Sequence, residues 1–130
     1  MSEPPAVLDA SALLALLQDE PGAATVAARM PNGVMSAVNL SEVVAKLADH
    51  GVPAGELRAV LDGLNIDVRD FDAETAYIAG ELHRTTRQAG LSFGDRACLA
   101  LAIQLGAVAI TADRTWTGLN GDRMRIDLIR

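Results

Sequence analysis

The stretch LSFGDRACLALAIQLGAVAITAD, residues 91–113, carries the pattern that decides the fold. Apolar residues recur at helical spacing over 93–105, Gly106 ends this helix, and the apolar run 107–111 is typical of a buried strand. An acidic residue, Asp113, follows the strand almost at once. A helix that leads into a short apolar strand is the unit from which parallel α/β sheets are built.

The same alternation of short apolar runs and helix-period stretches continues toward both ends of the chain. Strands are predicted at 6–8, 34–36, 66–71, 107–111 and 126–129. Helices are predicted at 11–18, 23–30, from about 39 to the stop at Gly51 and Pro53, and at 54–64, 73–88 and 93–105. The pattern therefore predicts an α/β fold with a mainly parallel central sheet.

The length of 130 residues fits one domain, and the predicted elements place its core over about 6–129. Half of the residues are hydrophobic and 22% are charged, a composition that excludes intrinsic disorder. The longest apolar runs fall far short of the about 18 residues that span a membrane. The N-terminal residues lack the basic region of a signal peptide. We therefore expect one soluble, cytoplasmic domain over residues 1–130, with no membrane partner.

The supply of cysteine and histidine limits the chemistry that the chain can perform. Cys98 is the only cysteine and lies in an apolar helix, so we expect a buried thiol and no internal disulfide. His50 and His83 are the only histidines, and neither lies at the end of a predicted strand. A zinc cluster and a Ser-His-Asp triad are therefore not expected.

The net charge of −6 is unevenly distributed along the chain. Residues 1–82 carry 4 Lys and Arg against 13 Asp and Glu, a net charge of −9. Residues 83–130 carry 7 Arg against 4 Asp, a net charge of +3. The overall acidity argues against a nucleic-acid partner, whereas the basic C-terminal part is suited to one.

Four acidic residues stand where the predicted fold would bring them together. Asp9, Glu42 and Asp113 each follow a predicted strand closely, and Asp95 opens the most apolar helix. The carboxyl ends of parallel strands share one edge of a sheet, so these acids are expected to converge. Converging carboxylates repel one another unless a cation neutralises them, and oxygen ligands select Mg²⁺ or Mn²⁺. Such an ion is suited to the hydrolysis of a phosphodiester.

Each of these acids also has an ordinary role at the start of a helix. An acid there accepts hydrogen bonds from free backbone N–H groups, as an N-cap or as part of a capping box. The candidate caps are Asp9, Asp113 and the pairs Asn39 with Glu42 and Ser92 with Asp95. Glu42 is also spaced to pair with Lys46, one helical turn later. Only the convergence of the four acids favours the metal site over these structural roles.

Other phosphate-handling sites fit the sequence less well. The chain contains no Gly-x-x-x-x-Gly-Lys loop and no Gly-x-Gly-x-x-Gly motif after a strand. The segment Asp9-Ala10-Ser11 lacks the second aspartate of an aspartyl-phosphate phosphatase. A receiver domain would need a lysine near the sheet edge, and the only lysine, Lys46, lies within a predicted helix. A phosphatase or a receiver is therefore disfavoured.

Four segments together resemble the acidic motifs of PIN-domain ribonucleases, specifically the VapC-type toxins of bacterial type II toxin–antitoxin pairs. They are VLDASALLALL at 7–17, SAVNLSEVVAKL at 36–47, LSFGDRACLALA at 91–102 and AITADRTW at 109–116. The resemblance extends from about Val7 to Ile129 in order and spacing. It implies a three-layer α/β/α fold and a metal-dependent endoribonuclease that cuts a structured, translation-related RNA. It also implies a homodimer inhibited by a VapB-type antitoxin, in a heterotetramer or larger complex.

The matching positions imply which residues carry the activity. The implied catalytic acids, which would bind Mg²⁺ or Mn²⁺, are Asp9, Glu42, Asp95 and Asp113. Ser11 and Thr111 match positions that support the acids. The implied reaction is hydrolysis, in which water deprotonated with help from a carboxylate attacks phosphorus and leaves a 5′-phosphate and a 3′-hydroxyl.

Arginines of the C-terminal part are the candidates for holding RNA. They are Arg84, Arg87, Arg96, Arg114, Arg123 and Arg125. Arg96 and Arg114 adjoin two of the acids, but either could instead form a salt bridge. The chain has too few aromatic residues for a base-stacking platform, and we expect Trp116 to lie in the core. The main alternative function is a PIN-like RNA-binding or scaffold module with weak or no catalysis.

Overall fold

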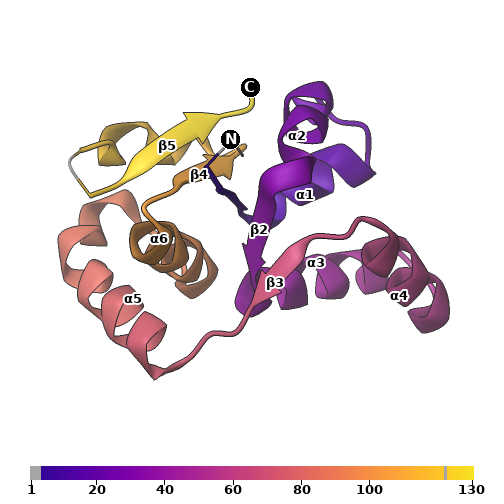
Figure 1. The fold of residues 1–130 in the computed structure, drawn as a ribbon, viewed down its shortest axis with the longest axis horizontal. Helices are drawn as coiled ribbons and strands as arrows, with labels where there is room; N and C mark the ends of the chain where they lie inside the picture. The colour runs from indigo at the N-terminus through magenta and orange to yellow at the C-terminus, as the bar shows by residue number, and fades with distance from the viewer. Residues whose placement is uncertain (1–3, 122) are drawn as a thin grey trace.

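A computed structural model describes residues 4–121 and 123–130 and contains a five-stranded sheet (Figure 1). The strands are β1 (Ala6–Leu8), β2 (Gly33–Ser36), β3 (Asp67–Arg69), β4 (Val108–Thr111) and β5 (Arg125–Leu128). They lie in the order β3-β2-β1-β4-β5, and each of the four strand pairs is parallel. The predicted α/β fold with a parallel sheet is therefore confirmed.

Six α-helices within the described residues connect these strands, close to the positions that the sequence predicts. They are α1 (Ala10–Leu17), α2 (Ala23–Arg29), α3 (Ala37–Asp49), α4 (Ala54–Gly63), α5 (Ala73–Thr85) and α6 (Phe93–Leu105). Three 3-10 turns complete the described part of the chain: η1 (Met30–Asn32), η2 (Arg87–Ala89) and η3 (Arg114–Leu119). Two of these turns were not predicted. The predicted helix 73–88 ends at Thr85 and is followed by η2, and η3 follows β4.

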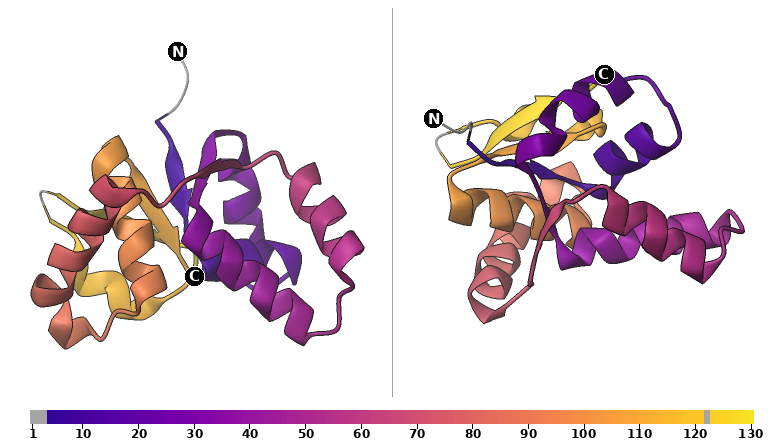
Figure 2. Two further views of the ribbon diagram at one scale, coloured as in Figure 1. Left: turned by 90° about the horizontal axis from the view of Figure 1, so that it is seen from below. Right: turned by 45° about the vertical axis from the view of Figure 1, so that its right-hand side comes forward.

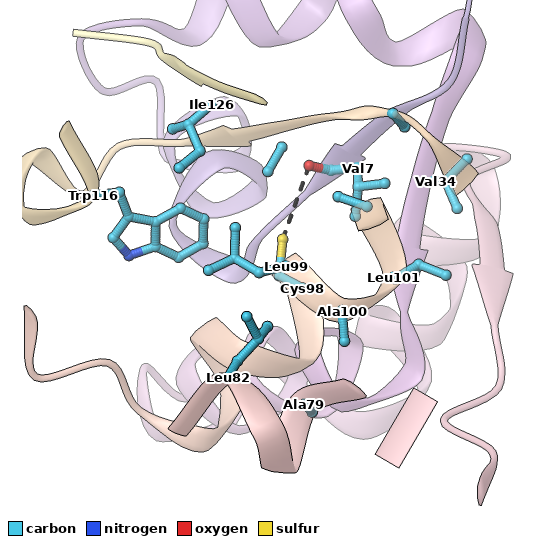
Figure 3. Packing of buried hydrophobic residues seen from close by; sticks show 13 residues of the cluster. Val7, Val34, Ala79, Leu82, Cys98, Leu99, Ala100, Leu101, Trp116 and Ile126 are labelled. Atoms are coloured by element: carbon cyan, nitrogen blue, oxygen red, sulfur yellow. Dashed lines mark hydrogen bonds between the residues drawn. The ribbon is translucent and has the colours of Figure 1, made fainter. Parts of the chain in front are cut away.

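The side chains of the strands alternate between two hydrophobic clusters, one on each face of the sheet. Val7, Val34, Ala109 and Ile126 pack with α5, α6 and Trp116 on one face (Figure 3). Ala6, Leu8, Met35 and Ile110 pack with α1, α2, α3 and α4 on the other face. Successive residues of a strand point to opposite faces, so two apolar faces require cover on both sides. The expected three-layer α/β/α arrangement is confirmed.

Helix α6 lies against the middle of the sheet, and most of its side chains are buried. Seven of its residues are buried, and all but two of these are glycine, alanine or cysteine. Small residues allow a helix to lie close to the strands that it covers. Cys98 is fully buried and its Sγ points at the carbonyl oxygen of Val7, 4.0 Å away (Figure 3). The burial expected for Cys98 and for Trp116 is confirmed.

The opposite edge of the sheet is much more thinly covered. All three residues of β3 are exposed, and Leu57 is the one residue of α4 that is buried. Helices α3 and α4 extend beyond this edge, which is clear in the two further views (Figure 2). Among the described residues, the helices are all too short or too polar to cross a membrane.

Candidate active site

Asp9 stands at the carboxyl end of β1, where the chain turns into α1. Its Oδ1 accepts hydrogen bonds from the Ser11 hydroxyl (2.7 Å) and from the Ala12 backbone N–H (2.8 Å), and its Oδ2 accepts one from the Thr111 hydroxyl (2.6 Å). The side chain therefore caps α1, as one of its two predicted roles requires.

The environment of Asp9 opposes its negative charge. The residue is only 4% exposed, and this burial raises its pKa from 3.8 to about 6. The hydrogen bonds from Thr111, Ala12 and Ser11 act in the other direction, because they stabilise the carboxylate. The charge of Asp95 raises the pKa slightly further, so Asp95 lies close enough to repel Asp9.

The hydroxyls of Ser11 and Thr111 join the ends of β1 and β4 around Asp9. The Ser11 Oγ accepts a hydrogen bond from the Ala112 N–H (3.0 Å), and the Thr111 Oγ1 accepts one from the Asp113 N–H (3.0 Å). The two hydroxyl oxygens are 3.3 Å apart. Together these two residues fix the orientation of the Asp9 carboxylate, and their support of a catalytic site stays a prediction.

Glu42 reaches the same edge from α3, and Asn39 holds it there. The Asn39 Nδ2 donates to Glu42 Oε1 (2.8 Å) and to the Gly94 carbonyl oxygen (2.9 Å). The Glu42 carboxylate packs so closely on Gly94 that a Cβ at that position would overlap it. One amide group therefore ties Glu42 to the first turn of α6.

The predicted capping box of Asn39 with Glu42 is wrong. Helix α3 begins two residues earlier than expected, and its N-cap is Ser36, whose Oγ accepts from the Val38 N–H (3.2 Å). Asn39 is consequently inside the helix and 1% exposed. The alternative pairing of Glu42 is not formed either, since Lys46 forms no ion pair within the described residues.

Asp95 forms the predicted capping box with Ser92 at the start of α6. Its Oδ2 accepts from the Ser92 backbone N–H (2.9 Å), and the Ser92 Oγ accepts from the Asp95 N–H (3.2 Å). The pKa of the nearby Cys98 thiol is raised well above its ordinary value, first by burial and then by the charges of Asp9, Asp95 and Glu42. These three acids therefore lie around the N-terminal half of α6.

Asp113 stands next to this group but turns toward η3. Its Oδ1 accepts from the Thr115 N–H (2.9 Å) and from the Thr115 hydroxyl (2.7 Å), so it caps that turn. Its backbone N–H is bonded to Thr111, which is in turn bonded to Asp9. Asp113 is thus linked to the other acids through a hydrogen-bond chain, while its carboxylate is engaged by its own loop.

Comparison with known protein families identifies this arrangement. The family model of the PIN domain matches residues 6–120. The chain belongs to the PIN-domain family. Proteins of this family are generally nucleases and generally use divalent metal ions. No relative was found among the curated proteins.

Solved structures share the fold of this PIN domain over nearly its whole length. A toxin–antitoxin complex from Klebsiella pneumoniae has a TM-score of 0.75 at 17% identity and covers 96% of this chain and 98% of that chain. The DNA-bound VapBC from Salmonella typhimurium has a TM-score of 0.74 at 17% identity, with 98% and 100% covered. VapBC2 from Rickettsia felis, bound to a promoter DNA fragment, has a TM-score of 0.71 at 16% identity, with 95% and 97% covered. At these identities the likeness shows a common fold.

The acids of the PIN domain offer the type of ligand atom that a divalent metal ion needs, but they are not already arranged around a metal position. Within the described residues, no three Asp, Glu, His or Cys side chains are placed to hold an ion together. Protein donors engage one carboxylate oxygen each of Glu42, Asp95 and Asp113. Glu42 Oε2, Asp95 Oδ1 and Asp113 Oδ2 accept no hydrogen bond from the described residues. The donor set is all oxygen, as Mg²⁺ and Mn²⁺ prefer.

The predicted RNA-contacting arginines differ in the groups that they contact. Arg96 donates through Nη1 to the Ala79 carbonyl oxygen (3.0 Å) and lies 5.9 Å from the centre of the Phe93 ring, so it joins α6 to α5. Arg114 donates to the Arg130 carbonyl oxygen (2.9 Å). Arg125 donates to the Gly106 carbonyl oxygen. Five of the six candidates are exposed, namely Arg84, Arg87, Arg114, Arg123 and Arg125. Arg96 therefore helps to hold α6 against α5, and contact of any of these arginines with RNA stays a prediction.

Sequence reasoning missed Asn39 and Gly94 as parts of the site. A signal for Asn39 was present, because it shares the buried face of α3 with Val43 and Leu47. A lone polar residue on an apolar helix face must find a hydrogen-bond partner when buried. No comparable signal marks Gly94, since its importance comes from a carboxylate supplied by another helix.

Proposed function

We propose that this PIN domain is the toxin of a VapBC-type pair and acts as an Mg²⁺- or Mn²⁺-dependent endoribonuclease. The observation that supports this most is the gathering of Asp9, Glu42 and Asp95 around one end of α6. The pKa of Asp9 is raised to about 6 by burial, and it is opposed by hydrogen bonds from two hydroxyls and one backbone N–H rather than by a basic side chain of the described residues. A structural role would not require three carboxylates at one place, whereas a cation site does.

The metal would be held by Asp9, Glu42 and Asp95, with Asp113 at the margin of the site. When bound, a divalent ion supplies positive charge that stabilises a phosphodiester under attack and lowers the pKa of water. Ser11 and Thr111 hold Asp9 in a fixed orientation. Asn39 holds one oxygen of Glu42 and leaves the other free, and Gly94 leaves room for that carboxylate.

The same geometry suits the acids to handle a proton. Glu42 Oε2 and Asp95 Oδ1 accept no hydrogen bond from the described residues, so they are available to take a proton from attacking water. Hydrolysis of this kind leaves a 5′-phosphate and a 3′-hydroxyl, and it does not use the ribose 2′-hydroxyl. We expect structured RNA to be the substrate.

The likeness to toxin–antitoxin complexes supports a protein partner. We propose that a VapB-type antitoxin inhibits this domain and that the toxin is a homodimer in that complex. The three similar structures include the toxin–antitoxin complex from Klebsiella pneumoniae and two VapBC complexes bound to DNA. Isolation of the chain together with its bound partner identifies that partner.

The proposal is tested with purified protein freed from any antitoxin. Incubation with structured RNA and Mg²⁺ or Mn²⁺ should yield fragments with 5′-phosphates, and EDTA should prevent cleavage. Asp95→Asn should lower the cleavage rate at least about 100-fold, because a neutral amide binds a divalent ion more weakly than a carboxylate and does not take up a proton from water. Asp127→Asn is the control, since Asp127 is an exposed acid of β5. Equal cleavage by Asp95→Asn and the wild type would refute the assignment.

One observation favours the second candidate, a PIN-like RNA-binding or scaffold module. The described acids do not form a ready-made cage, so a metal would have to draw them together. For such a module, the protein would bind RNA in the same experiment without cutting it under any metal condition. Mapping of cut sites in total RNA after brief induction separates the two candidates in the cell.

A further inference from the structure

A polar cavity of about 540 Å³ lies between the C-terminal end of α5 and the turn η3. One wall is formed by residues 84–89, at the end of α5 and in η2. The other wall includes Thr115 and Leu119 of η3. The cavity is therefore built by two segments that are distant in the sequence, and both belong to the basic C-terminal part of the chain.

Two guanidinium groups give this cavity its charge. Arg84 and Arg87 line it, and none of the described residues that line it carries a carboxylate. Within the described residues, neither side chain forms an ion pair, although Arg29, Arg58, Arg69 and Arg130 all do. Guanidinium groups favour anions with several oxygens, which they bind through paired N–H donors. Gln88 and Thr115 add neutral polar groups to the same walls.

The cavity is connected to the acidic site through a single residue. Thr115 lines the cavity and donates both its N–H and its hydroxyl to Asp113 Oδ1. Asp113 is bonded through its N–H to Thr111, and Thr111 to Asp9. A continuous chain of hydrogen bonds thus leads from the basic cavity to the buried acid. An anion in the cavity would lie beside the acids rather than among them.

We propose that this cavity binds a phosphodiester group of the RNA strand that flanks the scissile one. Arg84 and Arg87 are then positioning residues, which hold the strand while the acids act on a neighbouring phosphate. The inference rests on the proposed ribonuclease function and assigns to it a substrate subsite. An acidic protein segment is a less suitable occupant, because the hydrogen-bond chain joins the cavity to the acids that act on the substrate.

The test compares two double variants with the same change in charge. Arg84→Gln with Arg87→Gln removes the cavity arginines, and Arg58→Gln with Arg69→Gln removes two arginines that are already ion-paired elsewhere. Both are made in the Asp95→Asn background, so that RNA is bound but not cut. Binding of a fluorescein-labelled stem–loop RNA is followed by anisotropy over a range of KCl concentrations.

The cavity variant should bind the RNA about tenfold more weakly at low salt, and the control should bind as its parent does. The dependence of log K on log salt should also become shallower by about 1 to 2, because about two phosphate contacts are lost. Equal losses in both variants, or an unchanged salt dependence, would overturn the proposal. Competition by a polyglutamate peptide that depends on Arg84 and Arg87 more strongly than RNA binding does would overturn it in favour of a protein ligand.

The outcomes also separate this inference from the proposed function. A wild-type protein that binds RNA through the cavity but never cuts it would refute the ribonuclease and retain the subsite. A wild-type protein that cuts RNA while the cavity variant binds normally would retain the ribonuclease and refute the subsite. Melting curves of both variants provide the folding control, and we expect them to resemble those of the parent because the arginines are exposed.

Discussion

The centre of the sheet and its β3 edge differ in how deeply they are packed. All three residues of β1 are fully buried, and α6 buries seven residues next to it. At the other edge, β3 is exposed and α4 buries Leu57 alone. The acid with the most unfavourable environment, Asp9, belongs to the centre. This domain thus holds its least favourably placed carboxylate where the surrounding residues are most deeply buried.

Near β3, the molecule exposes apolar side chains, whereas the centre of the sheet holds the buried Asp9 carboxylate. A cavity of about 430 Å³ lies between α3 and α4 and is lined largely by aliphatic side chains, among them Leu40, Val44, Leu57 and Leu61. Val60 and Val68 are also substantially exposed nearby. A region with few buried contacts contributes little to the stability of the isolated chain, so its sequence is freer to serve other purposes.

Truncation of a leucine should lower the free energy of unfolding far more at the centre of the sheet than at the β3 edge. Leu99→Ala in α6 removes a side chain that is 1% exposed, and we expect a loss of about 3 kcal/mol in the free energy of unfolding. Leu61→Ala in α4 removes a partly buried side chain and should cost about 1 kcal/mol or less. Urea denaturation measures both losses. Similar losses would show that the two regions are equally packed.

The second prediction concerns the charge of Asp9 and the dependence of stability on pH. The pKa of Asp9 in the folded protein, about 6, lies above the ordinary value of 3.8. At a pH between these two values, the folded protein therefore keeps a proton on Asp9 that the unfolded chain has released. The stability due to this proton is fully present below about pH 4 and is lost as pH rises to about 6. The loss amounts to at most about 3 kcal/mol.

Asp9→Asn tests this prediction because an amide has no charge to bury. Thr111 can accept a hydrogen bond from the new amide and turn its own hydroxyl toward Ser11, 3.3 Å away. The variant should therefore gain stability relative to the wild type as pH rises from about 4 to 6, and it should lose any stabilisation by Mn²⁺. Urea denaturation in EDTA across this pH range is the measurement. Parallel curves for the two proteins would contradict the raised pKa.

Substitution of two helical glycines by alanine should change the stability by smaller amounts and in opposite directions. Gly94→Ala places a Cβ against the Glu42 carboxylate and should cost about 1 to 2 kcal/mol, together with part of the stabilisation by Mn²⁺. Gly80→Ala, in α5, meets no atom within 4 Å and should stabilise the protein by about 0.5 to 1 kcal/mol. Thermal melting with and without Mn²⁺ measures both changes. A gain in stability for Gly94→Ala would show that Glu42 moves away at little cost.

The sequence predicted the elements of the fold well, because local periodicity and glycine stops act over short distances. It also predicted that Asp9 and Asp95 would stand at starts of helices, and both do. The order of the strands in the sheet could not be predicted from the sequence, because strand pairing depends on contacts between distant segments. Helix α3 begins earlier than predicted because Ser36 both ends β2 and caps the helix, so no loop residue marks the boundary.

Within the site, the residues that were missed act through partners from other elements. Asn39 matters because α6 brings Gly94 beside it, and Arg96 is engaged because α5 presents the Ala79 carbonyl oxygen. No pattern local to α3 or α6 contains that information. The acids could be found because topology gathers strand ends at one edge, but their hydrogen-bond partners could be found only in the folded chain.

The thiol of Cys98 can be used to measure how often α6 opens. Cys98 is fully buried, and burial together with the three acids keeps its pKa well above the ordinary value. A thiol in this state reacts with alkylating reagents only when the helix moves away from β1 and exposes it as a thiolate. The rate of alkylation therefore measures how often the helix that carries Asp95 opens, without any label being introduced. A ligand that holds the acids together would reveal itself by slowing that reaction.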